Sequence, residues 1–136
     1  MDYRKAFVWV LLLGGLATAC SDSPTSPGAT SIAGNWAGTL SDNFAGTGTV
    51  AFTFAQSGST LTGTWSTTYT NAGFNNGGSI SGTISGSSVT AVLSPSVPTT
   101  CPFNVVGTRS GSSLSGTYAA FNCQVAVSGT FNATKK

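Results

Sequence analysis

The sequence predicts an all-β domain that folds as an eight-stranded antiparallel up-and-down β-barrel. Apolar residues alternate with Ser or Thr through residues 31–134, as in 50–54 (VAFTF) and 80–84 (ISGTI). A period of two is typical of strands with one buried face, and no stretch of this region has the period of a helix. Thr suits the outward positions because its branched side chain fits a pleated surface.

A near-repeat and three similar turns support the strand assignment. An apolar residue, Ser or Thr, Gly, Thr and a second apolar or aromatic residue recur at 61–65, 80–84, 114–118 and 127–131. The turns are 57–60 (SGST), 85–88 (SGSS) and 110–113 (SGSS). Gly supplies the positive φ that tight hairpin turns require, so each turn predicts a hairpin.

The runs between the turns define the strands and their connections. The expected strands are 32–40, 48–56, 60–67, 78–85, 88–94, 101–109, 113–121 and 124–133. The connections 41–47, 68–77 and 95–100 are longer than the Ser-Gly turns, and in a meander they share the opposite end. Closing the sheet into a barrel removes its edge strands. A two-sheet β-sandwich has the same pattern and is the alternative.

Strand alternation also predicts which side chains point inward. Nineteen residues, mostly large and apolar, share the inward face, and many Gly residues share it with them. Repeated inward Gly indicates that the strands bend or that large neighbours need room. The expected inward set is Ile32, Trp36, Leu40, Val50, Phe52, Phe54, Leu61, Trp65, Ile80, Ile84, Val89, Leu93, Phe103, Val105, Leu114, Tyr118, Val125, Val127 and Phe131.

Two of the three cysteines lie within the predicted domain. Cys101 begins the sixth strand and Cys123 follows the seventh, so both fall at the long-loop end. We expect them to form a structural disulfide. Simple alternation places Cys101 opposite Asn122, so a bulge or a longer turn is needed to align the two cysteines.

The first 19 residues have the composition of a secretory signal peptide. Arg4 and Lys5 precede an apolar run at 6–16, which is followed by the small residues 17–19. This is the charged, apolar and small-residue order of an export signal. The apolar run has 11 residues, whereas a helix that crosses a bilayer needs about 20. We therefore expect a cleaved signal and not a membrane span.

The end of this signal, Ala17-Thr18-Ala19-Cys20, resembles the lipobox of bacterial lipoproteins. In that family the signal is cut before the Cys, so the resemblance implies that Cys20 carries a diacylglycerol and an acyl chain such as palmitate. The strongest lipobox has Leu where Ala17 stands, and an ordinary secretory cleavage that leaves Cys20 unmodified is the alternative. Pairing the other two cysteines leaves Cys20 over, which favours lipidation.

The residues after Cys20 extend the lipoprotein interpretation. Residues 20–30 combine this Cys with a polar, Pro-containing stretch that reads as a flexible tether, and the barrel domain occupies 31–136. Ser21 resembles the residue found after the Cys in lipoproteins sorted to the outer membrane of Gram-negative bacteria. The expected location is the cell envelope, with the domain outside the cytoplasm and the chain anchored to the outer membrane in a Gram-negative host.

The first strand opens with Gly34-Asn35-Trp36, which resembles the Gly-x-Trp signature of lipocalin and avidin-type barrels, together called calycins. In those families the Trp packs at the closed end under a cation from late in the chain. The resemblance therefore implies that Arg109 or Lys135 packs on Trp36 at the tight-turn end. The inward set has few polar groups, so the resemblance carries over the architecture and not biotin binding.

The composition argues against most kinds of chemistry. Ser, Thr and Gly supply 59 of the 136 residues, only 8 are charged, and the chain has no His and no Glu. Asp42 is the sole carboxylate side chain in the domain, so a Ser nucleophile has no base and no carboxylate pair exists. We expect no catalysis, no metal and no cofactor. Five Lys and Arg residues give no basic patch for nucleic acid.

A binding site is expected at the long-loop end, where flat apolar rings combine with amide groups. That mixture suits a small apolar or amphipathic ligand or a protein partner. In the alternative, the two Phe rings fold inward as a plug and the Asn residues shape turns. The candidate residues are Asn43, Phe44, Tyr69, Asn71, Phe74, Asn75 and Asn76.

Two functional hypotheses follow for this domain, which we expect to be a monomer. The first is a non-enzymatic, membrane-anchored lipoprotein whose barrel binds an apolar or amphipathic small ligand at its mouth. The second is a protein-interaction or structural envelope module, such as a barrel-type protease inhibitor, with a filled interior.

Overall fold

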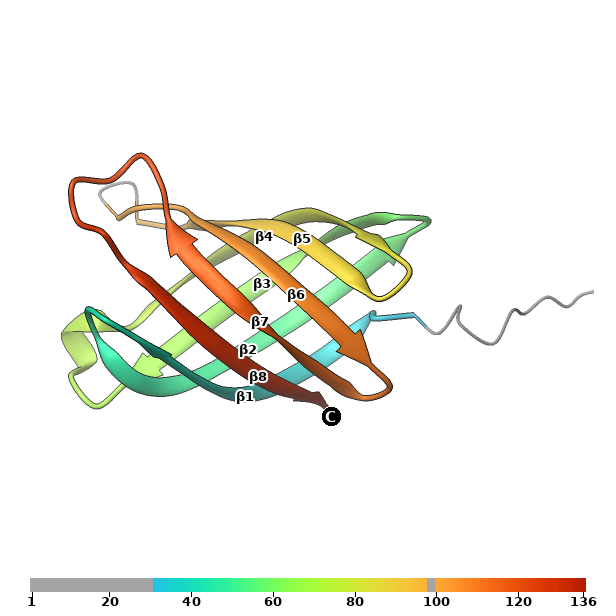
Figure 1. Ribbon diagram of the computed structural model, residues 1–136, viewed down its shortest axis with the longest axis horizontal. Coiled ribbons are helices and arrows are strands. Elements are labelled where there is room, and N and C mark those ends of the chain that lie inside the picture. The colour runs from blue at the N-terminus through green and yellow to red at the C-terminus, as the bar shows by residue number, and fades with distance from the viewer. Residues whose placement is uncertain (1–30, 98–99) are drawn as a thin grey trace, which may run out of the picture.

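The protein is a closed barrel of eight antiparallel strands in sequential order (Figure 1). The structure is a computed structural model that describes residues 31–97 and 100–136. Each strand pairs with its chain neighbours, and β1 closes the barrel on β8. This ring confirms the predicted up-and-down barrel and excludes the sandwich. The elements are β1 (Gly34–Asp42), β2 (Gly46–Ser57), β3 (Thr60–Tyr69), η1 (Ala72–Phe74), β4 (Asn76–Ser85), β5 (Ser88–Pro95), β6 (Phe103–Ser110), β7 (Ser113–Ala120) and β8 (Ser128–Lys135).

The connections divide between the two ends of the barrel as predicted (Figure 1). The turns after β2, β4 and β6 lie at one end, which we call the closed end. Gly58, Gly86 and Gly111 each adopt a φ of 60° at the first central position of these turns. A positive φ there matches the type II′ turn, whose twist fits paired strands. The longer connections lie at the other end, which we call the mouth.

The eighth strand begins later than the sequence predicts. Residues 121–127 form a loop, and β8 starts at Ser128. Pairing with β7 stops after Ala120 donates its N–H to the carbonyl of Val127 at 2.8 Å, because Asn122 then adopts a φ of 52° and the chain leaves the extended conformation. As a result Val125 lies in a loop and not on a strand, where it lines the cavity but is 47% exposed and is not part of the buried core.

The inward set otherwise forms one hydrophobic core. Side chains at the closed end are the most deeply buried, with Trp36, Leu61 and Leu114 no more than 1% exposed. Phe103 and Val127 are half-buried, and Ala91, Ala133 and Thr67 are buried although they were not predicted. Large side chains pack against inward glycines of neighbouring strands, as in the register pair Phe54 and Gly63.

The described residues include no helix with the length and apolarity needed to cross a membrane. The predicted signal peptide, Cys20 and the tether lie outside the described residues.

Candidate functional site

The mouth of the barrel opens into a cavity of about 360 Å³. Most of its wall is apolar because five strands direct large side chains inward at this level. The closed half below it is filled by the core, so the barrel is solid at one end and hollow at the other. The apolar wall consists of Leu40, Val50, Phe52, Leu93, Phe103, Val105 and Phe131.

Aromatic rings that meet edge to face stiffen this wall. The Phe103 ring lies 6.0 Å from Trp65 and 5.9 Å from Tyr118, with interplanar angles of 86° and 78°. Phe52 and Phe131 make a similar contact at 5.6 Å. Edge-to-face pairs are favoured by the ring quadrupoles and hold the rings in defined orientations. The cavity is therefore preformed.

A carboxylate with four hydrogen-bond donors lies at the rim of the cavity. Asp42 Oδ1 accepts from the backbone N–H groups of Phe44 at 2.9 Å and Ala45 at 2.6 Å. Its Oδ2 accepts from the hydroxyl of Tyr118 at 2.7 Å and that of Tyr69 at 3.0 Å. This cluster ties the turn after β1 to β3 and β7. Burial alone raises the pKa of Asp42, but the four hydrogen bonds outweigh burial and hold this pKa below its ordinary value.

The two tyrosines of the cluster remain protonated well above neutral pH. Burial, together with the charge of Asp42, raises the pKa of Tyr69 to about 12. Burial and the hydrogen bond to Asp42 raise the pKa of Tyr118 far above its ordinary value. Each hydroxyl therefore serves as a fixed donor to the carboxylate and not as a base.

Two buried polar atoms in the cavity wall have no hydrogen-bond partner within the described part of the chain. They are Trp65 Nε1 and Thr67 Oγ1, on residues that are 4% and 8% exposed. Trp36 differs, because its Nε1 donates to the carbonyl of Ile32 at 2.8 Å. A buried polar group without a partner costs about 1–3 kcal/mol. A ligand acceptor that reached Trp65 Nε1 would remove this cost for the indole group.

Five of the seven predicted loop residues line the cavity: Phe44, Tyr69, Phe74, Asn75 and Asn76. The rings of Phe44 and Phe74 contact each other with their centroids 5.2 Å apart. They are 53% and 37% exposed, so they form a pair on the rim and not a plug inside the barrel.

The predicted Asn residues mainly hold the loops in shape. Asn43 binds the loop before β8, accepting from Ser128 N at 2.9 Å and donating to the carbonyl of Ala126 at 3.0 Å. Asn71 caps η1 by accepting from Gly73 N at 2.9 Å. Neither Asn43 nor Asn71 lines the cavity.

Asn75 and Asn76 also bond to the backbone, although both line the cavity. Asn75 Oδ1 accepts from Tyr69 N at 2.7 Å, and Asn76 Oδ1 accepts from Gly77 N at 2.8 Å. The side-chain oxygens of Asn75 and Asn76, which were predicted to bind a ligand, therefore accept hydrogen bonds from the backbone.

Asp42, Tyr118 and Trp65 contribute polar groups to the site that the sequence pattern did not assign to it, since Tyr118 and Trp65 were expected only as inward core residues. A signal was present for two of them. Asp42 has the same strand parity as Leu40, which predicts an inward carboxylate, and an inward Tyr118 needs a hydrogen-bond partner. The sole carboxylate of the domain was the available acceptor.

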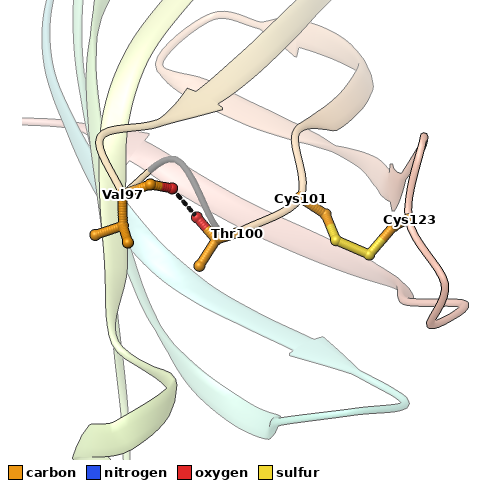
Figure 2. The surroundings of a disulfide bond; sticks show 4 residues. All are labelled: Val97, Thr100, Cys101 and Cys123. Atoms are coloured by element: carbon orange, nitrogen blue, oxygen red, sulfur yellow. Dashed lines mark hydrogen bonds between the residues drawn. A yellow bond between two sulfur atoms is a disulfide. The ribbon is translucent and has the colours of Figure 1, made fainter.

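The predicted disulfide between Cys101 and Cys123 is present at the mouth (Figure 2). It joins the residues before β6 to the loop before β8, with a Cα–Cα distance of 5.6 Å. The positive φ of Asn122 supplies the backbone irregularity that the pairing requires. Both cysteines line the cavity, so the bond holds part of its wall in place.

The residues predicted for the closed end do lie there. Lys135 is the register partner of Trp36, and its ammonium group donates to the carbonyl of Ser31 at 3.2 Å. Arg109 donates to the carbonyl of Gly111 at 3.3 Å. A cation packed on the Trp36 ring stays a prediction.

Comparison with known proteins identifies no relative, so the function is inferred from the cavity. No protein-family model matches the chain, and no curated protein matches it. Within residues 31–97 and 100–136, no three His, Cys, Asp or Glu side chains are grouped so that they could hold a metal ion.

Proposed function

We propose that the protein is a non-enzymatic binding protein whose barrel holds an apolar or amphipathic small molecule in the mouth cavity. The observation that supports this proposal is the cavity in the mouth half of the barrel. Its volume of about 360 Å³ is within the roughly 300–1,000 Å³ of typical small-molecule pockets. An apolar wall with a few polar groups is also typical of such sites.

The physical basis of binding is burial of apolar surface in a preformed space. Each CH₂ group transferred from water is worth about 0.8 kcal/mol. Little of this gain is lost to ordering, because the disulfide and the Asp42 cluster already hold the surrounding loops. An amphipathic ligand would place its apolar part against Leu93, Val105 and Phe131.

The state of the polar groups supports binding over catalysis. Asp42 is held ionised by four donors, while the pKa values of Tyr69 and Tyr118 are raised away from neutrality. A general acid or base works best with a pKa near the operating pH. None of these three groups is suited to that task.

The proposed cellular setting is the envelope of a bacterium, with a lipid on Cys20 as the anchor. The barrel begins at its closed end, opposite the mouth (Figure 1). At about 3 Å per residue, the 10 residues 21–30 can span up to roughly 30 Å. The anchor would thus leave the mouth free. Mass spectrometry of the native protein should find acyl chains on Cys20, and an unmodified Cys20 would contradict the anchor.

A dye-binding experiment with a matched pair of variants tests the cavity. Ala120 lines the cavity, whereas its neighbour Ala119 is exposed on the outer face. We expect a neutral apolar dye, N-phenyl-1-naphthylamine, to bind the protein, Ala120→Phe to abolish binding and Ala119→Phe to preserve it. Equal binding by all three proteins, or by none, would contradict the proposed function.

Binding of a protein partner is a second candidate, and one observation favours it. Four apolar side chains of the mouth loops are exposed, two of them in contact with each other, and exposed apolar patches mark interaction surfaces. These are Phe44, Phe74, Val97 and Val125, which are 53%, 37%, 52% and 47% exposed. A photo-crosslinking residue at position 44 should then give one defined protein adduct in cells, and a diffuse set of adducts would count against this candidate.

A further inference from the structure

We infer that the cavity is built for an uncharged amphiphile that carries a hydrogen-bond acceptor, and that it rejects anionic amphiphiles such as fatty-acid carboxylates. This inference rests on the proposed function and specifies the ligand. Two features of the cavity support it within the described residues: a donor in the wall without a partner, and a carboxylate on the rim with no cation near it.

The donor lies on a polar stripe that β3 contributes to the apolar wall. Trp65, Thr67 and Tyr69 occupy alternate positions of this strand and therefore share its inward face. Tyr69 ends the strand at the rim, and Trp65 lies deepest. Only the deeper two have a polar side-chain atom without a partner in the described residues. Both residues line the cavity, so their two polar atoms without a partner lie in its wall.

The chemistry of the indole group determines which hydrogen-bonding group the ligand needs. An indole N–H is a donor only, so Trp65 requires an acceptor. The edge contact with Phe103 fixes the ring, which makes the donor direction part of the cavity. Trp65 lines the cavity, and its Nε1 is almost fully covered by protein atoms. A narrow approach of this kind favours a single projecting oxygen, as in a ketone or ether, over a bulkier polar head.

The rim carboxylate sets the charge that the cavity accepts. Asp42 lines the opening, and its hydrogen bonds come from neutral groups, so no cation among the described residues cancels its charge. The cationic side chains of residues 31–136 are Arg109, Lys135 and Lys136, which belong to the closed end. A second negative charge brought into the mouth meets uncompensated repulsion, which is strong where water is partly excluded.

Three probes of similar size test both requirements by NMR. They are 2-octanone, its isostere 2-methyl-1-octene, which has no oxygen, and octanoate. The protein is the mature chain 20–136 with Cys20→Ala, which contains the complete barrel. Its two indole N–H signals come from Trp36 and Trp65. Trp36 is the internal reference because its N–H is already bonded to Ile32.

We expect 2-octanone to shift the Trp65 indole signal downfield while the Trp36 signal stays in place. The alkene should bind roughly tenfold more weakly, because it leaves the indole without an acceptor. Octanoate should also bind roughly tenfold more weakly than the ketone. The variant Asp42→Asn should bring octanoate close to the ketone and change ketone affinity less than about threefold.

The outcomes separate this inference from the proposed function. If the three probes bind equally well and the Trp65 signal does not move, the inference is wrong although the cavity binds small molecules. If no probe shifts any cavity signal, the proposed function fails and the inference fails with it. If Asp42→Asn does not fold, the three probes compared on the protein that retains Asp42 still test the inference.

Discussion

The hydroxyl of Tyr118 on β7 donates a 2.7 Å hydrogen bond to Oδ2 of Asp42 at the end of β1, joining residues 76 positions apart. The same oxygen also accepts from Tyr69 on β3. The domain's sole carboxylate side chain thus connects strands on different sides of the mouth and shapes the cavity opening.

Removing the Tyr118 hydroxyl should destabilise the barrel measurably. We expect Tyr118→Phe to lower the free energy of unfolding by about 1–3 kcal/mol, because it deletes a hydrogen bond to a charged group. Tyr69→Phe should cost less, since its bond is longer at 3.0 Å and the residue is only half-buried. Urea unfolding of both variants and of the double variant measures these costs and their coupling. Equal costs for the two single variants would contradict the proposed ranking.

The stability of the domain should fall in acid through a single side chain. The pKa of Asp42 is lowered in the folded protein, so its contribution is present above the unfolded pKa of about 3.9 and is lost as pH falls through the folded value. The slope should approach at most about 1.4 kcal/mol per pH unit, the value for one proton. Urea unfolding between pH 2 and 7 measures it, with Asp42→Asn expected to remove most of the acid limb. An unchanged acid limb in Asp42→Asn would show that another group is responsible.

The free energy of unfolding should also fall at high pH because of the two tyrosines. Their folded pKa values are raised, so the stability they contribute is complete below the unfolded pKa of about 10 and is lost as pH rises toward 12 for Tyr69. We expect unfolding free energy to decline over this window and the decline to be smaller in Tyr118→Phe. Unfolding measured at pH 9, 10 and 11 checks this, and identical declines in both proteins would contradict it.

Much of the fold was predictable from local pattern, and the exceptions have physical causes. Alternation and Ser-Gly turns locate seven strands to within two residues because side-chain parity and turn chemistry are local properties. The start of β8 was missed because 124–127 keeps the alternation of a strand. Its departure from the ladder depends on the positive φ of Asn122, a conformation that this residue type only sometimes adopts.

The candidate site was less predictable than the fold. Phe44 and Phe74 were found because they are apolar residues in loops. Trp65 was placed inward correctly, but parity does not distinguish a side chain that fills a core from one that lines a cavity. That distinction depends on how all eight strands together divide the interior volume, which no single segment encodes.

One inward glycine should tolerate no side chain. Gly63 has a φ of 153°, and a Cβ there would collide with the carbonyl of Thr53. We expect Gly63→Ala to lower the free energy of unfolding by about 2–4 kcal/mol through backbone strain and overpacking. Gly107→Ala is the matched control, because its nearest neighbour would be 3.2 Å away, and it should cost less than about 1 kcal/mol. Thermal or urea unfolding compares the two, and similar costs would contradict the steric account.

The disulfide should stabilise both the fold and the cavity. Cys101 and Cys123 are 22 positions apart, and closing a loop of that length is worth about 3 kcal/mol in the chain-entropy model. We expect the double variant Cys101→Ser, Cys123→Ser to lose about this much stability and to bind N-phenyl-1-naphthylamine more weakly. A reducing agent should weaken the native protein and leave the double variant unchanged. Equal sensitivity of both to reduction would contradict the assignment.

The barrel is hollow at the mouth and filled at the closed end. Its most direct test is a methyl NMR titration of the protein with 2-octanone, comparing Leu93 and Val105 in the cavity wall with Leu61 and Leu114 in the core. We expect saturable shifts of the two wall residues, with the two core residues nearly unchanged. An absence of shifts at Leu93 and Val105, or equal shifts at all four residues, would contradict it.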